Sequence, residues 1–295
     1  MYPFVKNQLG NMNTMLEKWM KKREAQFVLP ESVEIIRDIP YLDDGKACHL
    51  MDIYRPRDAV GPLPVIVDFH GGGMVLCTKE VNKFFCCELA KRGFLVFCVD
   101  YPLVPDADIP TLILDISRGM DRVGELLESY GGDRNRIYQI GDSAGGFLTV
   151  YAAAAQRNPE LAASVPVVPS SLPLRALGLI SGMFYTTEAD TACYFLRSDF
   201  YGKNWRKHPM SKFYHADCEG VAGSVPPCFL VTSGSDNLHS YTRRFVKGLE
   251  KQGTPHELLD FPLRKNLQHD FVVVTPEKPD SQYAIDRMVE FLLKH

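Results

Sequence analysis

A serine between glycines is the feature of this sequence that most directly indicates chemistry. Residues 141–146 read Gly-Asp-Ser-Ala-Gly-Gly, after the short apolar run 136–140 and before the small-residue run 147–155. A strand, a turn and a helix in this order place Ser143 at a sharp corner that pushes its hydroxyl outward. Glycine is needed at 141 and 145 because a β-carbon there would clash across the corner. We therefore predict that Ser143 is a nucleophile, although ordinary Gly/Ser loops share the short pattern.

A base must activate this serine, because a hydroxyl is a weak nucleophile at neutral pH. His269 is the favoured base, since it follows the last predicted strand by a short polar loop and so reaches the same sheet edge as Ser143. His239, shortly after Asp236, is the second choice. The histidines that lack a supporting context or would face solvent are His49, His208, His215, His256 and His295.

An acid must in turn orient the base, and Asp236 is the favoured residue. It follows the predicted strand 227–232 closely, so its carboxylate can meet a histidine from the loop of the next strand. Asp260 is the rival, but it lies inside a predicted strand and we expect it to be structural. Asp270, next to His269, is not expected to reach back to the Nδ1 atom of that histidine.

A glycine run supplies the remaining part of the chemistry. Residues 70–73 read His-Gly-Gly-Gly after a predicted strand, and glycines leave backbone N–H groups free to approach a ligand oxygen. Together with the N–H of Ala144, at the start of a predicted helix, they could hold the negative oxygen that forms when an acyl carbonyl is attacked. The alternative is a glycine-rich turn without this role.

Composition and charge exclude some other classes of protein. The 295 residues carry a formal charge of −3 and a pI near 6.2, so nothing favours binding to nucleic acid. No apolar run approaches the roughly 18 residues of a membrane-spanning helix, and residues 1–10 lack the pattern of a secretion signal. The eight cysteines show no C-x-x-C spacing, which indicates free thiols. We expect a cytoplasmic monomer or homodimer without cofactor, metal or stable membrane insertion.

Strands and helices are expected to alternate from residue 33 onward. Short apolar runs predict strands, and apolar residues at three- and four-residue intervals predict helices. The expected strands are 33–39, 50–54, 64–69, 94–99, 136–140, 174–180, 227–232 and 257–261. The expected helices are 79–92, 110–130, the segment after Ser143, 241–252 and 280–294.

This alternation implies an α/β fold with a mostly parallel central sheet and helices on both faces. Ligands of such sheets bind beyond the carboxyl ends of the strands, where all the motifs arrive. We expect a single domain over 1–295, with cap elements from about 1–30 and 183–223. The first cap segment contains an amphipathic helix that either packs on the domain or forms part of a lid. The second is rich in aromatic residues, shows no clear strand and is expected to be a helical insertion, so that the cap is helical.

The motifs resemble those of the hormone-sensitive-lipase-like (GDXG) family of α/β-hydrolases over nearly the whole chain. The His-Gly-Gly-Gly run and the Gly-Asp-Ser-Ala-Gly-Gly stretch carry the resemblance, and the segments 100–106 and 133–137 are similar to further family motifs. The resemblance implies an α/β-hydrolase fold with Ser143 as nucleophile, Asp236 as acid and His269 as base, in the chain order of that fold.

The resemblance also implies an oxyanion hole formed by Gly72, Gly73 and Ala144. Two positions depart from the family pattern. Asn237 follows the acid where the family usually has proline, and Pro102 stands where arginine is usual. Neither change removes a catalytic group.

These residues predict a serine hydrolase of small carboxylic esters, with a short acyl chain or a small aromatic group bound in an apolar pocket. Ser143 would attack the ester carbonyl, and water would then release the acyl-enzyme. Two alternatives stay open. The same triad serves amidases, formamidases and peptidases, in which the pocket selects the leaving group. A non-catalytic small-molecule receptor on this fold is the other, although such proteins lose a triad member and all three are present here.

Overall fold

An eight-stranded sheet runs through this computed structural model, which describes residues 1–165, 167–189 and 193–295. The strands lie in the order β1-β2-β4-β3-β5-β6-β7-β8. Antiparallel pairing joins β2 (Leu50–Pro56) to β1 (Val33–Pro40) and to β4 (Leu95–Val99). The other neighbours pair in parallel, and these strands are β3 (Leu63–Phe69), β5 (Gly132–Asp142), β6 (Leu174–Ile180), β7 (Cys228–Ser233) and β8 (His256–Phe261).

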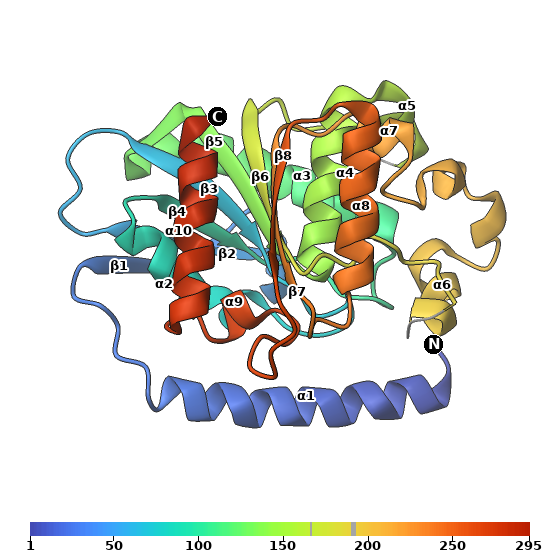
Figure 1. The fold of residues 1–295 in the computed structure, drawn as a ribbon, viewed down its shortest axis with the longest axis horizontal. Helices are drawn as coiled ribbons and strands as arrows, with labels where there is room; N and C mark the ends of the chain where they lie inside the picture. The colour runs from blue at the N-terminus through green and yellow to red at the C-terminus, as the bar shows by residue number, and fades with distance from the viewer. Residues whose placement is uncertain (166, 190–192) are drawn as a thin grey trace.

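Helices cover both faces of the sheet (Figure 1). One face carries α2 (Lys83–Lys91), α9 (Phe271–Val274) and α10 (Pro279–Lys294). The other face carries α3 (Ile109–Leu126), α4 (Ala144–Arg157) and α8 (His239–Gln252). The mostly parallel α/β sheet that the sequence predicts is therefore confirmed.

The sheet is covered twice because its central strands are apolar on both sides. Successive side chains of a strand point to opposite faces. In β3, Val65 and Val67 belong to the apolar cluster under α3 and α4, whereas Ile66 belongs to the cluster under α2 and α10. Such unbroken apolar runs are typical of buried parallel strands, and both clusters stabilise the layered fold by removing apolar surface from water.

The segment 183–223 is mostly helical, as the sequence predicts, and its residues 190–192 lie outside the described part of the chain. Its short helices are α6 (Cys193–Tyr201), α7 (Glu219–Ala222) and the 3-10 turns Trp205–Lys207 and Pro209–Phe213. An isolated bridge pairs Tyr185 with His215. Elements that the sequence did not predict are α5 (Pro159–Ser164), α9 and the 3-10 turn Ala47–His49. The 3-10 turns Lys79–Asn82 and Leu127–Tyr130 lie at the ends of the predicted helices 79–92 and 110–130.

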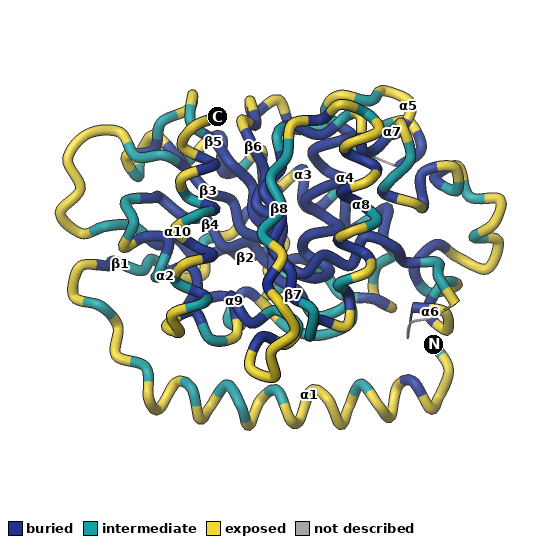
Figure 2. The backbone as a smooth tube through the Cα atoms, viewed as in Figure 1, coloured by how far each residue is buried: buried dark blue, intermediate teal, exposed yellow. Residues whose placement is uncertain are grey.

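The N-terminal helix α1 (Pro3–Glu24) runs along one side of the molecule, outside the layers that cover the sheet (Figure 1). Figure 2 shows that most of it is exposed, and Val5 is its buried residue. Its apolar residues recur at helical spacing, as the sequence predicts. Among the described helices, none is both long enough and apolar enough to cross a membrane.

Candidate active site

Ser143 lies at the corner between β5 and α4, with φ 48° and ψ −113°. A positive φ is uncommon for a residue with a side chain and marks a strained backbone. A β-carbon on Gly145 would overlap the carbonyl oxygen of Phe69, and one on Gly141 would overlap the backbone of Gly145. The need for glycine on both sides of Ser143 is therefore confirmed, because the strand and the helix touch at the corner.

Three side chains from separate loops form a hydrogen-bonded line at this corner. The Oγ atom of Ser143 lies 2.9 Å from Nε2 of His269, and Nδ1 of His269 lies 2.8 Å from Oδ1 of Asp236. Asp236 is buried and also accepts hydrogen bonds from Oγ1 of Thr232 at 3.0 Å and from the N–H of Leu238 at 2.9 Å. The carboxyl ends of β5, β7 and β8 bring the three residues together.

The neighbours of Asp236 keep its carboxyl group negatively charged. Burial alone raises the pKa of Asp236, but the hydrogen bond and charge of His269 and the N–H of Leu238 lower that pKa below its ordinary value. Burial lowers the pKa of His269, and the carboxylates of Asp270 and Asp236 outweigh burial and raise it. Asp236 is thus an anion that holds Nδ1–H, and Nε2 faces the serine.

Asp270 is a second carboxylate at the imidazole, and sequence reasoning missed it. Its Oδ2 atom lies 3.1 Å from Nε2 of His269, the nitrogen that also meets Ser143. Within the described part of the chain its buried Oδ1 atom has no hydrogen-bond donor. Burial and the charge of Asp270 raise the pKa of the neighbouring buried Asp142 well above its ordinary value.

The glycines of the 70–73 run lie at the same corner. Gly72 has φ 106° and Gly73 has φ 63°, values that favour glycine, and a β-carbon on Gly72 would overlap the carbonyl of Leu76. Both glycines line the cavity in front of Ser143. The N–H of Ala144 starts α4 and so has no partner within that helix. Their role as an oxyanion hole stays a prediction.

A network of buried side chains fixes the backbone of this run. Oδ2 of Asp142 accepts a hydrogen bond from the N–H of Gly71 at 3.0 Å. The hydroxyl of Tyr101 donates to the carbonyl of His70 at 2.6 Å, and the His70 ring lies 3.1 Å from Asp100 and stacks on Tyr101. The Asp-Tyr-Pro segment after β4 was the sequence signal that could have revealed this network. Its contacts with the 70–73 run, however, depend on β4 pairing with β3, which the sequence does not show.

The rival acid and the rival base lie away from Ser143 and pair with each other. Nε2 of His239 lies 2.9 Å from Oδ1 of Asp260, near the N-terminus of α8. Arg243 reaches the same carboxylate at 3.6 Å. These contacts agree with the structural role that the sequence predicts for Asp260.

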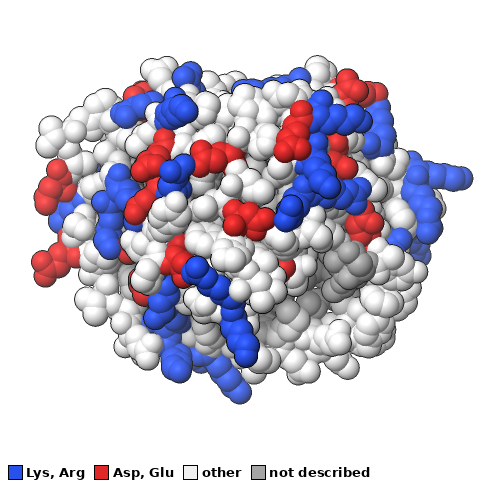
Figure 3. All heavy atoms as spheres, in the orientation of Figure 1, with Lys and Arg blue, Asp and Glu red and all other residues white. Residues whose placement is uncertain are grey.

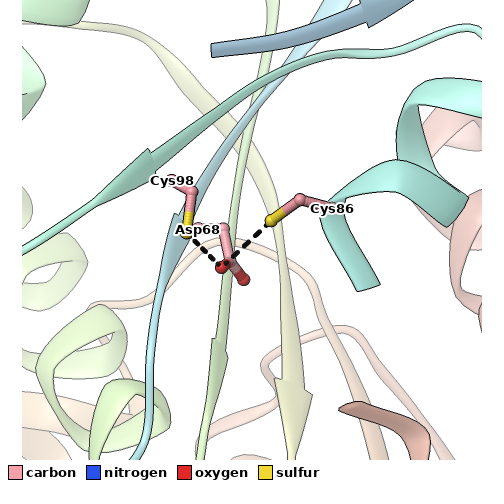
Figure 4. A group of neighbouring side chains, drawn as sticks. All are labelled: Asp68, Cys86 and Cys98. Atoms are coloured by element: carbon pink, nitrogen blue, oxygen red, sulfur yellow. Dashed lines mark hydrogen bonds between the residues drawn. The ribbon is translucent and has the colours of Figure 1, made fainter. Parts of the chain in front are cut away.

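Among the described residues, a single group of side chains has a geometry that could hold a metal ion, namely Asp68, Cys86 and Cys98 (Figure 4). The two thiols lie 3.6 and 3.4 Å from Oδ2 of Asp68, and Asn82 donates to the same oxygen at 2.9 Å. Burial raises the pKa of both thiols, to about 12 for Cys98, which favours S–H donors over metal-binding thiolates. The group therefore fits a hydrogen-bonded core cluster.

A cavity of about 820 Å³ opens in front of the serine. Ser143, His269 and Asp270 form its polar part, and α1 forms one of its walls. A cavity of this size is typical of sites for small organic molecules. The arrangement therefore places a hydrogen-bonded Ser-His-Asp line, two glycines of the 70–73 run and room for a ligand in one place.

Solved structures share the fold. Esterase B from Lactobacillus Rhamnosis superposes with a TM-score of 0.89 at 21% identity, covering 97% of this chain and 93% of that one. The thermostable carboxylesterase EstE1, cloned from a metagenomic library, superposes with a TM-score of 0.74 at 20% identity, covering 96% of each chain. At such identities the likeness concerns the fold.

Curated relatives extend the comparison to sequence. A "Probable isoprenylcysteine alpha-carbonyl methylesterase" of Arabidopsis thaliana is 31% identical over 290 residues, which cover 88% of this chain and 60% of that protein. Esterase LipC of Mycobacterium tuberculosis is 26% identical over 246 residues, 76% of this chain and 60% of that protein. The chain spans between 30% and 60% of the length of the first curated relatives it matches.

A family model settles the assignment. The model of the alpha/beta hydrolase fold family Abhydrolase_3 matches residues 66–273, a stretch that includes the second half of β3, the serine corner and His269. The chain therefore belongs to this alpha/beta hydrolase fold family, the family of the hormone-sensitive-lipase-like proteins that its motifs resemble.

Proposed function

We propose that this chain is a serine carboxylesterase that works through a Ser143, His269 and Asp236 triad. The observation that carries the proposal is the hydrogen-bonded line from Ser143 Oγ to His269 to the buried Asp236, at the floor of an open cavity. The esterases among its relatives, and a structure of esterase B from Lactobacillus Rhamnosis inhibited by a tributyrin phosphonate, support a carboxylic ester as substrate.

The geometry suits an acyl-enzyme mechanism. His269 takes the proton of Ser143 through Nε2 as Oγ attacks the ester carbonyl, and it then gives this proton to the leaving alcohol. Asp236 holds Nδ1–H and stabilises the imidazolium that forms in between. Water, activated by the same nitrogen, releases the acid and restores the serine.

The oxyanion that forms on attack needs donors already in place. The backbone N–H groups of Gly72, Gly73 and Ala144 are the proposed donors, because they lie beside Ser143 and the glycine conformations expose them. Loss of one such donor typically costs about 2.7–4 kcal/mol of barrier.

The triad does not by itself select an ester over an amide, or one acyl group over another. Esters are favoured because the relatives with named activities are esterases. The predicted short acyl chain would occupy the part of the cavity nearest Ser143. The predicted partner is a small-molecule ester, handled by a monomer or a homodimer.

Replacement of the nucleophile tests the proposal. We expect Ser143→Ala to lower kcat for p-nitrophenyl acetate by about four orders of magnitude or more, and to abolish labelling by a fluorophosphonate, with an unchanged circular dichroism spectrum. Ser129→Ala, at an exposed position, is the matched control and keeps full activity. Unchanged turnover in Ser143→Ala would contradict the triad. A higher kcat/KM on a matched amide than on the ester would favour an amidase instead.

A further inference from the structure

Helix α1 is held to the rest of the molecule at its two ends. Near its start Val5 is buried in the apolar cluster under α3 and α4. Near its end Arg23 pairs with Glu277 at 3.0 Å, and Glu24 pairs with Lys83. Among the described residues, the α1 side chains between these ends make no hydrogen bond or ion pair to another element. Leu9 packs against the same apolar cluster, and the middle of the helix otherwise borders a cavity.

That cavity is the one in front of Ser143. The residues of α1 that line it run from Phe4 to Trp19, which corresponds to about 22 Å along a helix that rises about 1.5 Å per residue. The catalytic Ser143 opens into the same cavity of about 820 Å³. A short acyl group on Ser143 would leave most of this length unfilled.

The walls away from the serine are mostly apolar, and Gln8 of α1 adds one uncharged polar side chain. The body supplies Val75, Leu76, Met183, Phe195 and Leu196 opposite α1. Among the described lining residues, the ionisable acid and base are Asp270 and His269, and both lie at the catalytic corner. Residues 7–16 of α1 carry no charge, and Figure 3 shows an uncharged margin at the lower right, where this stretch lies. A ligand lying along α1 must therefore be uncharged and apolar.

One side of the cavity is open to solvent at the middle of α1. Met12 and Met15 line the cavity, yet they are 54% and 71% exposed. Exposed apolar groups beside a site gain free energy when a ligand covers them. Methionine side chains are flexible and adapt to a chain of variable shape. A bound hydrocarbon chain would thus pack between the two methionines and the apolar wall opposite α1.

We propose that this cavity binds a long hydrocarbon chain of an ester, extended along α1 with the ester carbonyl at Ser143. The inference rests on the proposed esterase function and names its substrate class as lipid-like esters, with the chain on the acyl or the alcohol side. This substrate class differs from the short-acyl ester expected from the sequence. The apolar face of α1 can be read from the sequence, but the volume of the cavity under that face cannot.

A chain-length series tests the substrate class. With p-nitrophenyl acetate, butyrate, octanoate and laurate below their micelle concentrations, we expect kcat/KM to rise at least tenfold from acetate to laurate, mainly through a lower KM. Alkyl acetates of two to twelve carbons, followed by acid release, give the alcohol arm. A kcat/KM that falls with chain length in both the acyl and the alcohol series would overturn the proposed hydrocarbon-chain site. If p-nitrophenyl acetate is still hydrolysed, the esterase proposal stands.

A filled cavity gives the second test. Leu16 lines the cavity from the middle of α1, and Leu16→Trp should lower the laurate-to-acetate ratio of kcat/KM at least tenfold. Asn11→Trp, at an exposed α1 position outside the cavity, is the matched control and keeps the wild-type ratio. Equal ratios in both variants would overturn the proposed placement of the chain.

Binding without turnover separates the two proposals. In Ser143→Ala, fluorescent methyl parinarate should bind, methyl laurate should displace it, and methyl acetate should not. Adding Leu16→Trp should weaken this binding at least tenfold. Absence of probe binding would overturn the chain site whatever the activity. Probe binding together with wild-type turnover in Ser143→Ala would overturn the triad and keep the chain site.

Discussion

His269 has a carboxylate beside each ring nitrogen. Asp236 lies 2.8 Å from Nδ1 and Asp270 lies 3.1 Å from Nε2. Asp236 orients the ring, as in a Ser-His-Asp triad, whereas Asp270 shares Nε2 with Ser143. A negative Asp270 stabilises the imidazolium, and so it raises the pH at which Nε2 becomes free to accept the serine proton.

This arrangement predicts the pH dependence of the Asp270→Asn variant. The acid limb of kcat/KM reports the pKa of the essential base in the free enzyme. Asp270 raises the pKa of His269, so removing its charge lowers that pKa. We expect the acid limb to move to lower pH by about one unit, since nearby opposite charges shift a pKa by about 1–3 units. Rates on p-nitrophenyl acetate measured across the pH range check this.

The neighbours of Asp270 determine how this result is interpreted. The ionisable groups that act on it are His269, Asp142 and Asp236, and burial raises its own pKa. Asp260→Asn, which removes a carboxylate paired with His239, is the matched control. It should leave the acid limb of kcat/KM at the wild-type pH. A limb that stays fixed in Asp270→Asn would mean that Asp270 is neutral beside His269.

Sequence reasoning located Ser143, Asp236 and His269 because parallel strands deliver their following loops to one edge. It missed the contact of Asp270 with Nε2 because that contact depends on backbone conformation. Asp270 has φ 55°, a left-handed value that turns its side chain toward the imidazole. A positive φ outside glycine leaves no regular signature in a sequence.

Helix starts show how local chemistry sets element boundaries. Asp108 precedes α3, and its Oδ1 accepts hydrogen bonds from the N–H of Thr111 at 3.0 Å and from its hydroxyl at 2.6 Å. Pro110 lies in the first turn, where its missing N–H costs nothing. The cap and the proline together fix the start of a helix that packs against α4.

We expect Asp108→Ala to lower the free energy of unfolding by about 1 kcal/mol, within about 0.5–2 kcal/mol, because the N-cap acceptor is lost. Urea unfolding followed by circular dichroism measures this. Asp121→Ala, at an exposed position inside the same helix, is the control and changes stability by less than about 0.5 kcal/mol. Equal losses in the two variants would argue against a capping role for Asp108.

The sequence predicted most elements to within a few residues and failed where tertiary contacts decide. Pro110 marked the start of α3 because proline acts locally. The expected helix 79–92 instead opens with the 3-10 turn Lys79–Asn82. There the N–H of Lys79 donates to the carboxylate of Asp100, just after β4, and the amide of Asn82 donates to that of Asp142, at the end of β5. Those partners are distant in sequence, so periodicity could not reveal them.

At the scale of the whole molecule, two tiers of stability are expected. The sheet and the helices on its faces share two large apolar clusters. Helix α1 contributes Val5 to one of them and packs the half-buried Leu9 against it. Its other end is held by the ion pairs of Arg23 with Glu277 and of Glu24 with Lys83. Exposed ion pairs contribute little and weaken with salt. Opening of α1 should therefore need less free energy than unfolding of the sheet.

Native-state hydrogen exchange tests this difference. We expect the amides of α1 to exchange at least tenfold faster than those of α10, whose Ile285 and Met288 lie in an apolar cluster, and 1 M salt to widen the gap. Helix α10 is the internal control because it too lies on the surface and, with 16 residues against 22 in α1, also spans several turns. Equal exchange in the two helices would mean that α1 unfolds only with the whole molecule.

The contacts of α1 also set an order of assembly. Glu24 meets Lys83, which lies 59 residues later, and Arg23 meets Glu277, which lies 254 residues later. A ribosome releases α1 before either partner, and Glu277 emerges 254 residues after Arg23. Helix α1 can therefore complete its docking only after these partners have been made, so the wall of the cavity closes over a serine corner that has already formed.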